Sequence, residues 1–326
     1  MYERRNKTLC AIATAVFALL ASNALAQTYP SQTIRIIVPT PAGGIADLAA
    51  RTLAQKLTEA GKTAVVENQT GGAGAIAATT VARASPDGHT LLIAMHQTNA
   101  ILPHLASDLK YDGIKDFSPI TNLLASGNIL VINPSLPVKT VRELVQYAKG
   151  NPGKVTYASQ GNGSSGHIAA EQFKMLAGID ITHVPYRGAA PAAQDLVAGH
   201  VSMMFDIVPL AKVQIESGKL IGLGVATNQR LDAVPNVPTM LEAGFPTLQG
   251  GPWFGLAAPA GTPRPIIDVL NSEARKAFAA AEVRQRFESQ GMTIPLSTPE
   301  DFGAFIQSEH QRWGKIIRDA NIKIQP

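Results

Sequence analysis

The chain has 326 residues, of which 45% are hydrophobic and 16% are charged. This composition excludes an intrinsically disordered chain, which needs low hydrophobicity and high net charge, and a single cysteine excludes an internal disulfide scaffold. A formal charge of +4 over this length gives little support to nucleic-acid binding. Since the length suits one large domain or two ordinary ones, the order of predicted elements has to decide between them.

The first 26 residues predict a secretory signal peptide. Met1 to Lys7 carries three basic residues, Leu9 to Leu20 is apolar, and Ala24-Leu25-Ala26 has the small–x–small form of a signal-peptidase site. The alternative is a membrane anchor, but the apolar run is shorter than the roughly 20 residues that span a bilayer. We therefore expect cleavage after Ala26 and an exported protein, 27–326, with a charge of +2 and no cysteine.

The first half of this mature chain alternates β-branched runs with helical patterns. It predicts strands at 34–38, 64–67 and 90–94, separated by helices at 47–59 and 73–84. Strands that are separated by single helices indicate βαβ units and a mostly parallel sheet.

The pattern then restarts, which predicts a second α/β lobe. The expected strands are 129–132, 155–158, 181–184, 201–205 and 220–226, and the expected helices are 141–149, 164–176 and 189–197. Prolines and glycines make 228–252 irregular. Three helices, near 265–280, 282–290 and 299–320, close the chain, and the last has an apolar face that predicts core packing, formed by Phe302, Phe305, Ile306, Trp313, Ile316 and Ile317.

Each predicted lobe has a strand that runs into a glycine-rich turn and then into a helix. The turns are 39–47 and 158–167. Such a turn leaves backbone N–H groups free at the positive end of the helix dipole and so favours an anion, and glycine lets a ligand approach the backbone. Ordinary strand-to-helix turns with Asp47 and Ser164 as helix caps explain the same residues, so both interpretations stay open.

The second turn also spells Gly161-x-Gly163-x-x-Gly166, the dinucleotide-binding fingerprint. That fingerprint requires an acidic residue about 20 positions further on, at the end of the next strand. Asp180 comes too early and precedes the strand. We therefore expect no nucleotide cofactor.

Motifs for catalysis and metal binding are missing from the sequence. It has no G-x-S-x-G pattern, no cysteine after processing, and no H-E-x-x-H pair among its seven histidines. His167 and Glu171 lie one helical turn apart, which favours a helix-surface or capping pair. We expect no metal, no cofactor and no enzymatic activity, with an exported serine hydrolase that uses Ser164 or Ser165 with His167 as the alternative.

Two further groups of polar residues lie at the carboxyl ends of predicted strands, where α/β sheets bind ligands. Tyr186-Arg187-Gly188 follows one strand and Phe205-Asp206 ends another. Arg187 fits either a fork with a ligand carboxylate or a salt bridge to Asp206 or Asp195. Trp253-Phe254 either walls a cleft or fills the core, and core filling is the commoner fate.

Taken in order, these motifs resemble the solute receptors of tripartite tricarboxylate transporters, also called Bug proteins. The resemblance spans essentially the whole mature chain. The residues that carry it are Val38-Pro39 with Gly43-Gly44, Asp47 and Ala50-Arg51; Val66-Glu67-Asn68 with Gly71-Gly72-Ala73-Gly74; Ser85-Pro86-Asp87-Gly88; His183-Val184-Pro185-Tyr186-Arg187-Gly188; Asp195-Leu196 with Gly199; Met204-Phe205-Asp206; and Trp253-Phe254-Gly255 with Ala258-Pro259-Ala260-Gly261-Thr262-Pro263.

The resemblance implies a monomeric periplasmic receptor with the type II periplasmic-binding-protein fold, two α/β lobes around a ligand cleft. We expect residues 27–127 and 250–326 to form lobe 1 and residues 128–249 to form lobe 2. The receptor would deliver a small organic carboxylate to a two-subunit membrane permease, or would serve a sensor kinase as an accessory receptor. The ligand-binding residues that it implies are Ala42, Gly43, Gly44, Asp47, Gln97, Thr98, Ser159, Gly163, Ser164, Ser165, Tyr186, Arg187, Gly188 and Asp206.

Departures from the family pattern concern the ligand. Gln97-Thr98-Asn99 stands where many relatives have Gly-Thr-His, Ile207 stands where Asn is frequent, and Thr40 and Ala42 replace Phe and Pro. The bulkier Gln97 and the apolar Ile207 suggest a pocket that is reshaped for one carboxylate. Our hypothesis is a preference for aromatic acids.

Overall fold

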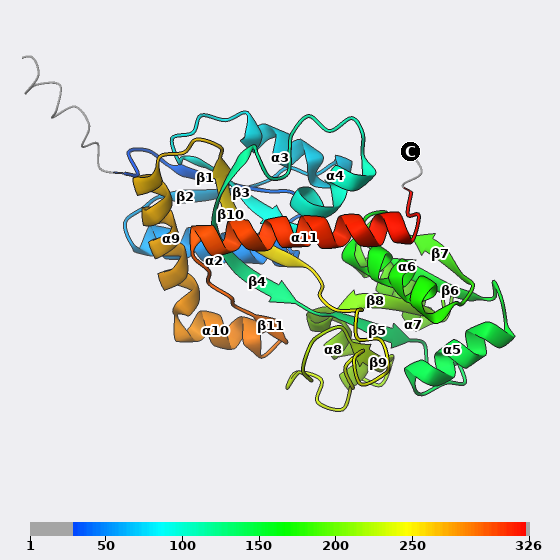
Figure 1. Ribbon diagram of the computed structural model, residues 1–326. Helices are drawn as coiled ribbons and strands as arrows, with labels where there is room; N and C mark the ends of the chain where they lie inside the picture. Colours follow the sequence, from blue (N-terminus) through cyan, green and yellow to red (C-terminus); the bar gives the residue numbers. More distant parts are fainter. Residues whose placement is uncertain (1–28, 324–326) are drawn as a thin grey trace, which may run out of the picture.

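The computed structural model describes residues 29–323, which form two α/β lobes side by side (Figure 1). The predicted signal peptide, its cleavage site after Ala26 and Cys10 lie outside the described residues. Lobe A is built on a six-stranded sheet and lobe B on a five-stranded sheet. The expected two-lobed α/β architecture is therefore confirmed.

Sheet A contains β1 (Ile34–Val38), β2 (Ala64–Asn68), β3 (Thr90–Met95), β4 (Phe117–Ser126), β10 (Trp253–Pro259) and β11 (Met292–Thr293). Its strand order is β11-β4-β10-β3-β1-β2. Strands β2, β1 and β3 are parallel, whereas β10 runs antiparallel to both β3 and β4. Every residue of β10 is buried because apolar clusters cover both faces of the sheet.

Sheet B contains β5 (Asn128–Ile132), β6 (Val155–Ser159), β7 (Ile181–Pro185), β8 (Met203–Ile207) and β9 (Ile221–Val225). Its order is β7-β6-β8-β5-β9, with β7, β6 and β8 parallel and β5 antiparallel to both β8 and β9. Each lobe thus has three parallel strands whose carboxyl ends lie at one edge of its sheet.

Helices cover both sheets. Those packed on sheet A are α2 (Ile45–Glu59), the 3-10 turn η1 (Gly72–Gly74), α3 (Ala75–Ala82), the π-helical turn η2 (His96–Ile101), α4 (Leu102–Leu105), α9 (Arg264–Ala279), α10 (Ala281–Glu288) and α11 (Pro299–Asp319). Those of lobe B are α5 (Val141–Gly150), α6 (Ser165–Ala177), α7 (Ala189–Ala198) and α8 (Val208–Glu216).

Helix α11 crosses the front of the molecule from lobe A towards α6 of lobe B (Figure 1), and it contacts α6. It begins with Thr298, whose hydroxyl accepts a hydrogen bond from the Asp301 N–H at 3.1 Å, and with proline at its first position. Its apolar face is buried, apart from the half-buried Phe305, so the predicted core packing is confirmed.

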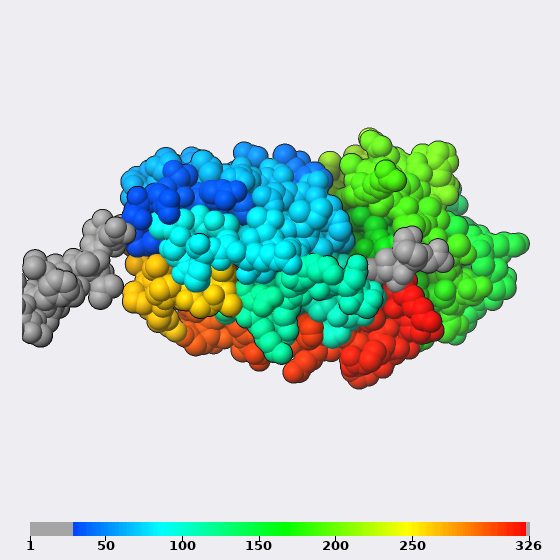
Figure 2. Space-filling model, turned by 90° about the horizontal axis from the view of Figure 1, so that it is seen from above, coloured from blue at the N-terminus to red at the C-terminus, as the bar shows by residue number. Residues whose placement is uncertain are grey.

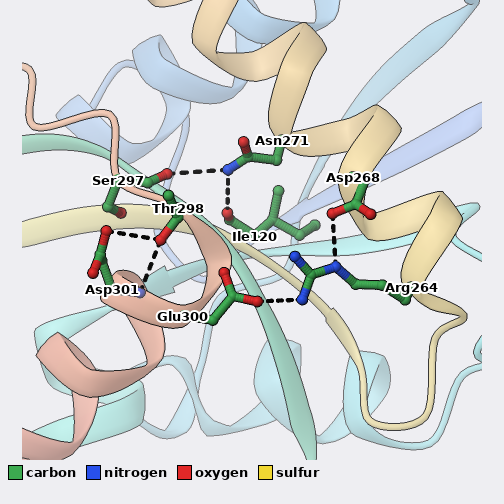
Figure 3. A network of polar contacts seen from close by, with 8 residues as sticks. All are labelled: Ile120, Arg264, Asp268, Asn271, Ser297, Thr298, Glu300 and Asp301. Atoms are coloured by element: carbon green, nitrogen blue, oxygen red, sulfur yellow. Dashed lines mark hydrogen bonds and ion pairs between the residues drawn. The ribbon is translucent and has the colours of Figure 1, made fainter.

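A polar network joins the start of α11 to α9 and β4 (Figure 3). Asn271, which is 9% exposed, donates its amide to the carbonyl oxygens of Ile120 at 2.7 Å and Ser297 at 3.0 Å. On the solvent side, Arg264 pairs with Asp268 and Glu300. The buried amide satisfies two backbone acceptors and therefore fixes where α11 begins.

The described chain crosses between the lobes twice, from β4 to β5 and again before β10, and hydrogen bonds join these crossings to each other and to the end of β9. The Ser126 N–H donates to the Pro252 carbonyl at 2.9 Å, the Asn128 N–H to Gly250 at 3.2 Å, and the Gly250 N–H to Ala226 at 2.8 Å. The chain leaves sheet A after β4 and enters sheet B at β5. The crossings lie near the predicted lobe boundaries at 127/128 and 249/250, which themselves stay a prediction.

Arg312 of α11 holds these crossings from one side. It donates to the Gln249 carbonyl at 2.9 Å, pairs with the buried Glu309 at 2.7 Å and stacks over Trp313 at 4.1 Å. Gly250 has a φ of +91°, and a side chain there would meet the guanidinium. Helix α11 therefore contacts the chain that crosses between the lobes and also packs on the core of lobe A.

The structure adds elements that the sequence analysis did not predict. These are η2, α4, α8, β4, β10 and β11. The predicted helix 73–84 is interrupted, because Ala73 has a positive φ and α3 starts at Ala75. The strand expected at 201–205 is β8, shifted by two residues, so Asp206 is its last residue but one. Trp253 fills the core, as predicted, against Phe302 and Phe305.

Candidate functional site

The first glycine loop connects β1 to α2. Ala42, Gly43 and Gly44 are exposed, Gly43 has a φ of +86°, and α2 begins after Gly44 without a side-chain cap. Free backbone N–H groups at the start of a 15-residue helix attract an anion. The three predicted ligand residues of this loop are thus open to solvent.

Asp47 supports this loop from inside the first turn of α2. It is 2% exposed, and its carboxylate accepts hydrogen bonds from the Gly43 N–H at 2.9 Å, Arg51 at 2.9 Å and Asn68 at 3.0 Å. Burial alone would raise the pKa of Asp47, but these hydrogen bonds outweigh it and lower the pKa below its ordinary value. Asp47 is therefore an ionised, fully engaged support and not the N-cap that the sequence suggested.

Two more loops of lobe A meet the first. A side chain on Gly74 would collide with Thr98 and Pro39, so the ends of β1 and β3 and the turn after β2 touch at this point. Thr98 is wholly buried and its hydroxyl donates to Asn99 Oδ1 at 2.7 Å, whereas Gln97 is partly exposed. Of these two predicted ligand residues, Gln97 has the accessible side chain.

The second glycine loop connects β6 to α6 and is more buried than the first. Gly161 and Gly163 have positive φ values, +126° and +75°. Ser164 is the N-cap of α6, as the alternative capping interpretation expected, and accepts from the His167 N–H at 3.3 Å. Ser165 donates to the Asn128 side chain at 3.2 Å, which places the start of α6 against the chain crossing.

The remaining predicted residues of lobe B lie beside this loop. The Tyr186 N–H donates to the Ser159 carbonyl at 3.1 Å, and the Gly188 N–H donates to Gln160 at 3.2 Å. The Tyr186 hydroxyl donates to Asp195 at 2.6 Å. Arg187 is exposed and, within residues 29–323, pairs with neither Asp195 nor Asp206, so the salt bridge considered above is not formed.

Asp206 is the deeply buried acid of this cluster, with 1% of its surface exposed. Burial raises its pKa to about 6, against hydrogen bonds from the Ile207 N–H at 2.8 Å and from Gln160 at 3.3 Å. The other amide atom of Gln160, Oε1, is buried without a hydrogen-bond partner. Sequence reasoning missed Gln160, because a lone glutamine beside a glycine turn carries no signal of its own.

The structure thus gathers the predicted residues into two groups, one at the strand carboxyl ends of each sheet. In lobe B the loops are joined by hydrogen bonds, and in lobe A they are joined by packing around Gly74. Figure 2 shows the blue and cyan surface of lobe A lying beside the green surface of lobe B. Each group presents the N-terminus of a long helix, which is an arrangement that binds anions.

A separate pocket of about 380 Å³ lies at the chain crossings. It is lined by residues of both crossings and of the segment after β9, together with Gly291, Thr293, Glu309 and Arg312. None of the predicted ligand residues lines it, and the Arg312 guanidinium is already paired with Glu309. We therefore assign this pocket to the junction of the lobes and not to ligand capture.

Two negative findings apply to the described part of the chain. In residues 29–323, no group of three or more His, Cys, Asp or Glu side chains is arranged to hold a metal ion. Over the same range, no helix combines the length and the apolar character needed to cross a membrane.

Solved structures of two proteins from Rhodopseudomonas palustris share this architecture. Rpa4515, solved with adipate, is 33% identical to this chain with a TM-score of 0.84, over 90% of this chain and 99% of that one. MatC, solved with bound malate, is 34% identical with a TM-score of 0.80, over 89% and 100%. The fold is accordingly that of the two-lobed periplasmic binding proteins.

The sequence comparison narrows this class to one family. The profile described as "Tripartite tricarboxylate transporter family receptor" matches residues 45–322. Protein BugT of Bordetella pertussis is 35% identical over 316 residues, which cover 96% of both chains. The chain belongs to the tripartite tricarboxylate transporter receptor family, as its motifs indicated.

Proposed function

We propose that this protein is a periplasmic receptor that captures a small organic carboxylate between the two glycine loops and delivers it to a two-subunit membrane permease. The observation that carries the proposal is the pair of loops at the N-termini of α2 and α6, each with positive-φ glycines. Adipate and malate in the two similar structures support a carboxylate ligand. Whether aromatic acids are preferred stays a hypothesis.

The neutral donors of the loops bind the anion. In lobe A, these are the N–H groups of the exposed Ala42 and Gly44, on either side of Gly43, whose own N–H is held by Asp47, with Gln97 and Thr98 beside them. In lobe B, the binding residues are Ser159, Gly163, Ser164 and Ser165, with Tyr186, Arg187, Gly188 and Asp206 alongside. In a closed, water-poor cleft, partial charges on oriented N–H groups act more strongly than in water.

Ligand binding then couples to lobe closure. The ligand contacts both lobes only in the closed state, so it stabilises that state by those extra contacts. A ligand present at 100 times its dissociation constant stabilises the fold by about 2.7 kcal/mol. The closed form is the one that the permease would recognise.

We infer that the protein is not an enzyme. Ser164 accepts a hydrogen bond from the His167 backbone, and Ser165 donates to Asn128. The His167 ring nitrogen Nδ1 accepts from the Gly163 N–H instead. Neither serine is therefore paired with the imidazole as a nucleophile and its base would be. Ester turnover by the purified protein would contradict this inference.

The test is a ligand screen with one clean loop variant. Residues 27–326 are titrated with adipate, malate, citrate and benzoate, by thermal shift and then by calorimetry. Gly44→Val is suited to the test because Gly44 has an ordinary φ of −77° and no atom closer than 3.6 Å to an added Cβ. The valine should abolish binding without unfolding the protein, because it covers the loop N–H groups.

The matched control is Ala60→Val, which adds bulk at the exposed far end of the same helix. It should bind like the wild type. If no carboxylate raises the melting temperature, or if Gly44→Val binds normally, the two-loop proposal is wrong.

A further inference from the structure

The two glycine loops are held by the same device. In α2, the third helical residue, Asp47, accepts a hydrogen bond from the N–H of Gly43, four residues earlier. In α6, the third helical residue, His167, accepts at Nδ1 from the N–H of Gly163, also four residues earlier, at 3.2 Å. The side chain reaches back past the N-cap and fixes the glycine that precedes it.

Helix α5 shows that a carboxylate is a frequent acceptor in this device. Glu143, its third residue, accepts from the Lys139 N–H at 2.6 Å. A carboxylate suits the start of a helix, because the dipole stabilises negative charge there. The acceptor at α6 is therefore an imidazole, whereas the acceptors at α2 and α5 are carboxylates.

The surroundings explain this departure. Asp47 has its cation four residues later, in Arg51, which neutralises the carboxylate. The residue four positions after His167 is Glu171, an acid that accepts a hydrogen bond from the Tyr157 hydroxyl. A carboxylate at position 167 would be buried without the ion pair that Arg51 gives to Asp47, and the residue at the position of Arg51 would be another acid, so burying it would be costly.

The imidazole is also oriented by neighbouring rings. His167 stacks on His183 of β7 with centroids 4.2 Å apart, and His183 stacks on Tyr157 of β6 at 4.7 Å, both within 14° of parallel. His183 Nε2 lies 2.7 Å from the Ser159 hydroxyl, at the other end of the same loop. The stack therefore contacts the loop at both ends.

His167 is neutral in this arrangement. Its Nδ1 accepts from Gly163 and so has no proton, which places the ring proton on Nε2. Burial lowers the pKa of His167 to about 4. Burial, His167 and Lys174 lower the pKa of His183 to about 4, although Glu171 opposes this. Both rings therefore stay uncharged near pH 7.

We propose that His167 is the positioning residue of the second glycine loop, the uncharged counterpart of Asp47 in the first. Its neutral imidazole accepts the Gly163 N–H and so fixes the loop, which leaves the N–H groups at the start of α6 to receive the anion, without placing an unpaired negative charge beside that anion. The inference rests on the proposed function in one respect, namely that the ligand of the loop is an anion.

The first arm of the test needs no ligand. Nitrogen NMR of wild-type 27–326 should show an unprotonated Nδ1 and a protonated Nε2 on His167, unchanged between pH 6 and 8. His167→Leu should exchange the Gly163 amide hydrogen roughly tenfold faster, since one hydrogen bond is lost, and His167→Asn, whose Oδ1 can replace Nδ1, should restore slow exchange. Titration of His167 near pH 6.5, or unchanged exchange in His167→Leu, would overturn the proposal.

The second arm measures binding of whichever of adipate, malate, citrate and benzoate binds the wild type most tightly. His167→Leu should weaken it roughly tenfold and His167→Asn by less than about threefold. Glu143→Leu, which removes the same device from α5, is the matched control and should leave affinity unchanged. Equal affinity of the leucine and asparagine variants would refute the positioning role. If none of the four acids binds the wild type, the proposed function fails, while the NMR arm still decides the role of His167.

Discussion

Replacing Asp206 by asparagine should stabilise the ligand-free protein at neutral pH. Asp206 is 1% exposed and accepts from the Ile207 N–H and from Gln160, but no cation pairs with it in the described residues. Asparagine keeps an oxygen that can accept these bonds and removes the buried charge. The variant therefore separates the cost of the charge from the benefit of the hydrogen bonds.

The magnitude follows from the pKa. Burial raises the pKa of Asp206 from 3.8 to about 6, so the folded protein holds this proton more tightly than the unfolded chain does. Stability then falls as pH rises through the window from about 4 to 6, and two pKa units correspond to about 3 kcal/mol. Asp206→Asn should thus exceed the wild type in free energy of unfolding by up to about 3 kcal/mol at pH 7.5, and by almost nothing at pH 4.

Urea unfolding at pH 4, 5.5 and 7.5 measures this difference directly. Asp180→Asn is the control, because the Asp180 side chain is 65% exposed and its replacement should change stability little at any of these pH values. A difference that is the same at pH 4 and pH 7.5, or a less stable Asp206→Asn at pH 7.5, would refute the reasoning.

Three other outcomes are expected. Asp206→Asn should also remove any tightening of carboxylate binding between pH 8 and pH 6, measured by calorimetry, since Asp206 is the buried acid of the proposed site that takes up a proton there. Gly255→Ala should lower the free energy of unfolding, measured in urea, by about 1–3 kcal/mol or more, because its Cβ would lie 2.1 Å from the Phe302 ring and 2.8 Å from a backbone oxygen. Gly150→Ala is the control, because an added Cβ there meets no atom within 4 Å and should not destabilise the fold. Asn271→Ala should lower the melting temperature and cost about 1–3 kcal/mol, because the Ile120 carbonyl loses its bond from the amide, whereas the Ser297 carbonyl still accepts from the Thr121 hydroxyl. Arg264→Ala, which breaks only exposed pairs, should cost under about 1 kcal/mol.

The parallel parts of both sheets were predictable from the sequence. Strands such as β1 and β6 are short β-branched runs followed by glycine turns, and local pattern is enough to find them. Strands β4 and β10 were missed because their partners are far away in sequence. The run 253–259 mixes aromatic residues with Gly and Ala, and only its central place between β3 and β4 makes it a strand.

The candidate site divides in the same way. A glycine turn before a helix is a recognisable sequence pattern, so Gly43, Gly44 and Gly163 could be predicted from the sequence. The residues that support the loops could not be found in this way, because Gln160 bonds to Asp206 of the neighbouring strand β8 and His167 of α6 stacks on His183 of β7. The sequence did contain one usable signal. Asp47 and His167 occupy the same position after their glycines, four residues on, and the alignment of the two turns shows it.

The central place of β10 also sets an order of folding. In the described structure β4 pairs with β10 and β11, which both come near the end of the chain, and β3 has one free edge until β10 is present. Sheet B, by contrast, is complete by Val225. During synthesis, lobe B can therefore form while sheet A still exposes unpaired edges, which invite aggregation. A chain that stops before Trp253 would contain a complete sheet B, but β3 and β4 of sheet A would lack their partner β10 and expose unpaired edges.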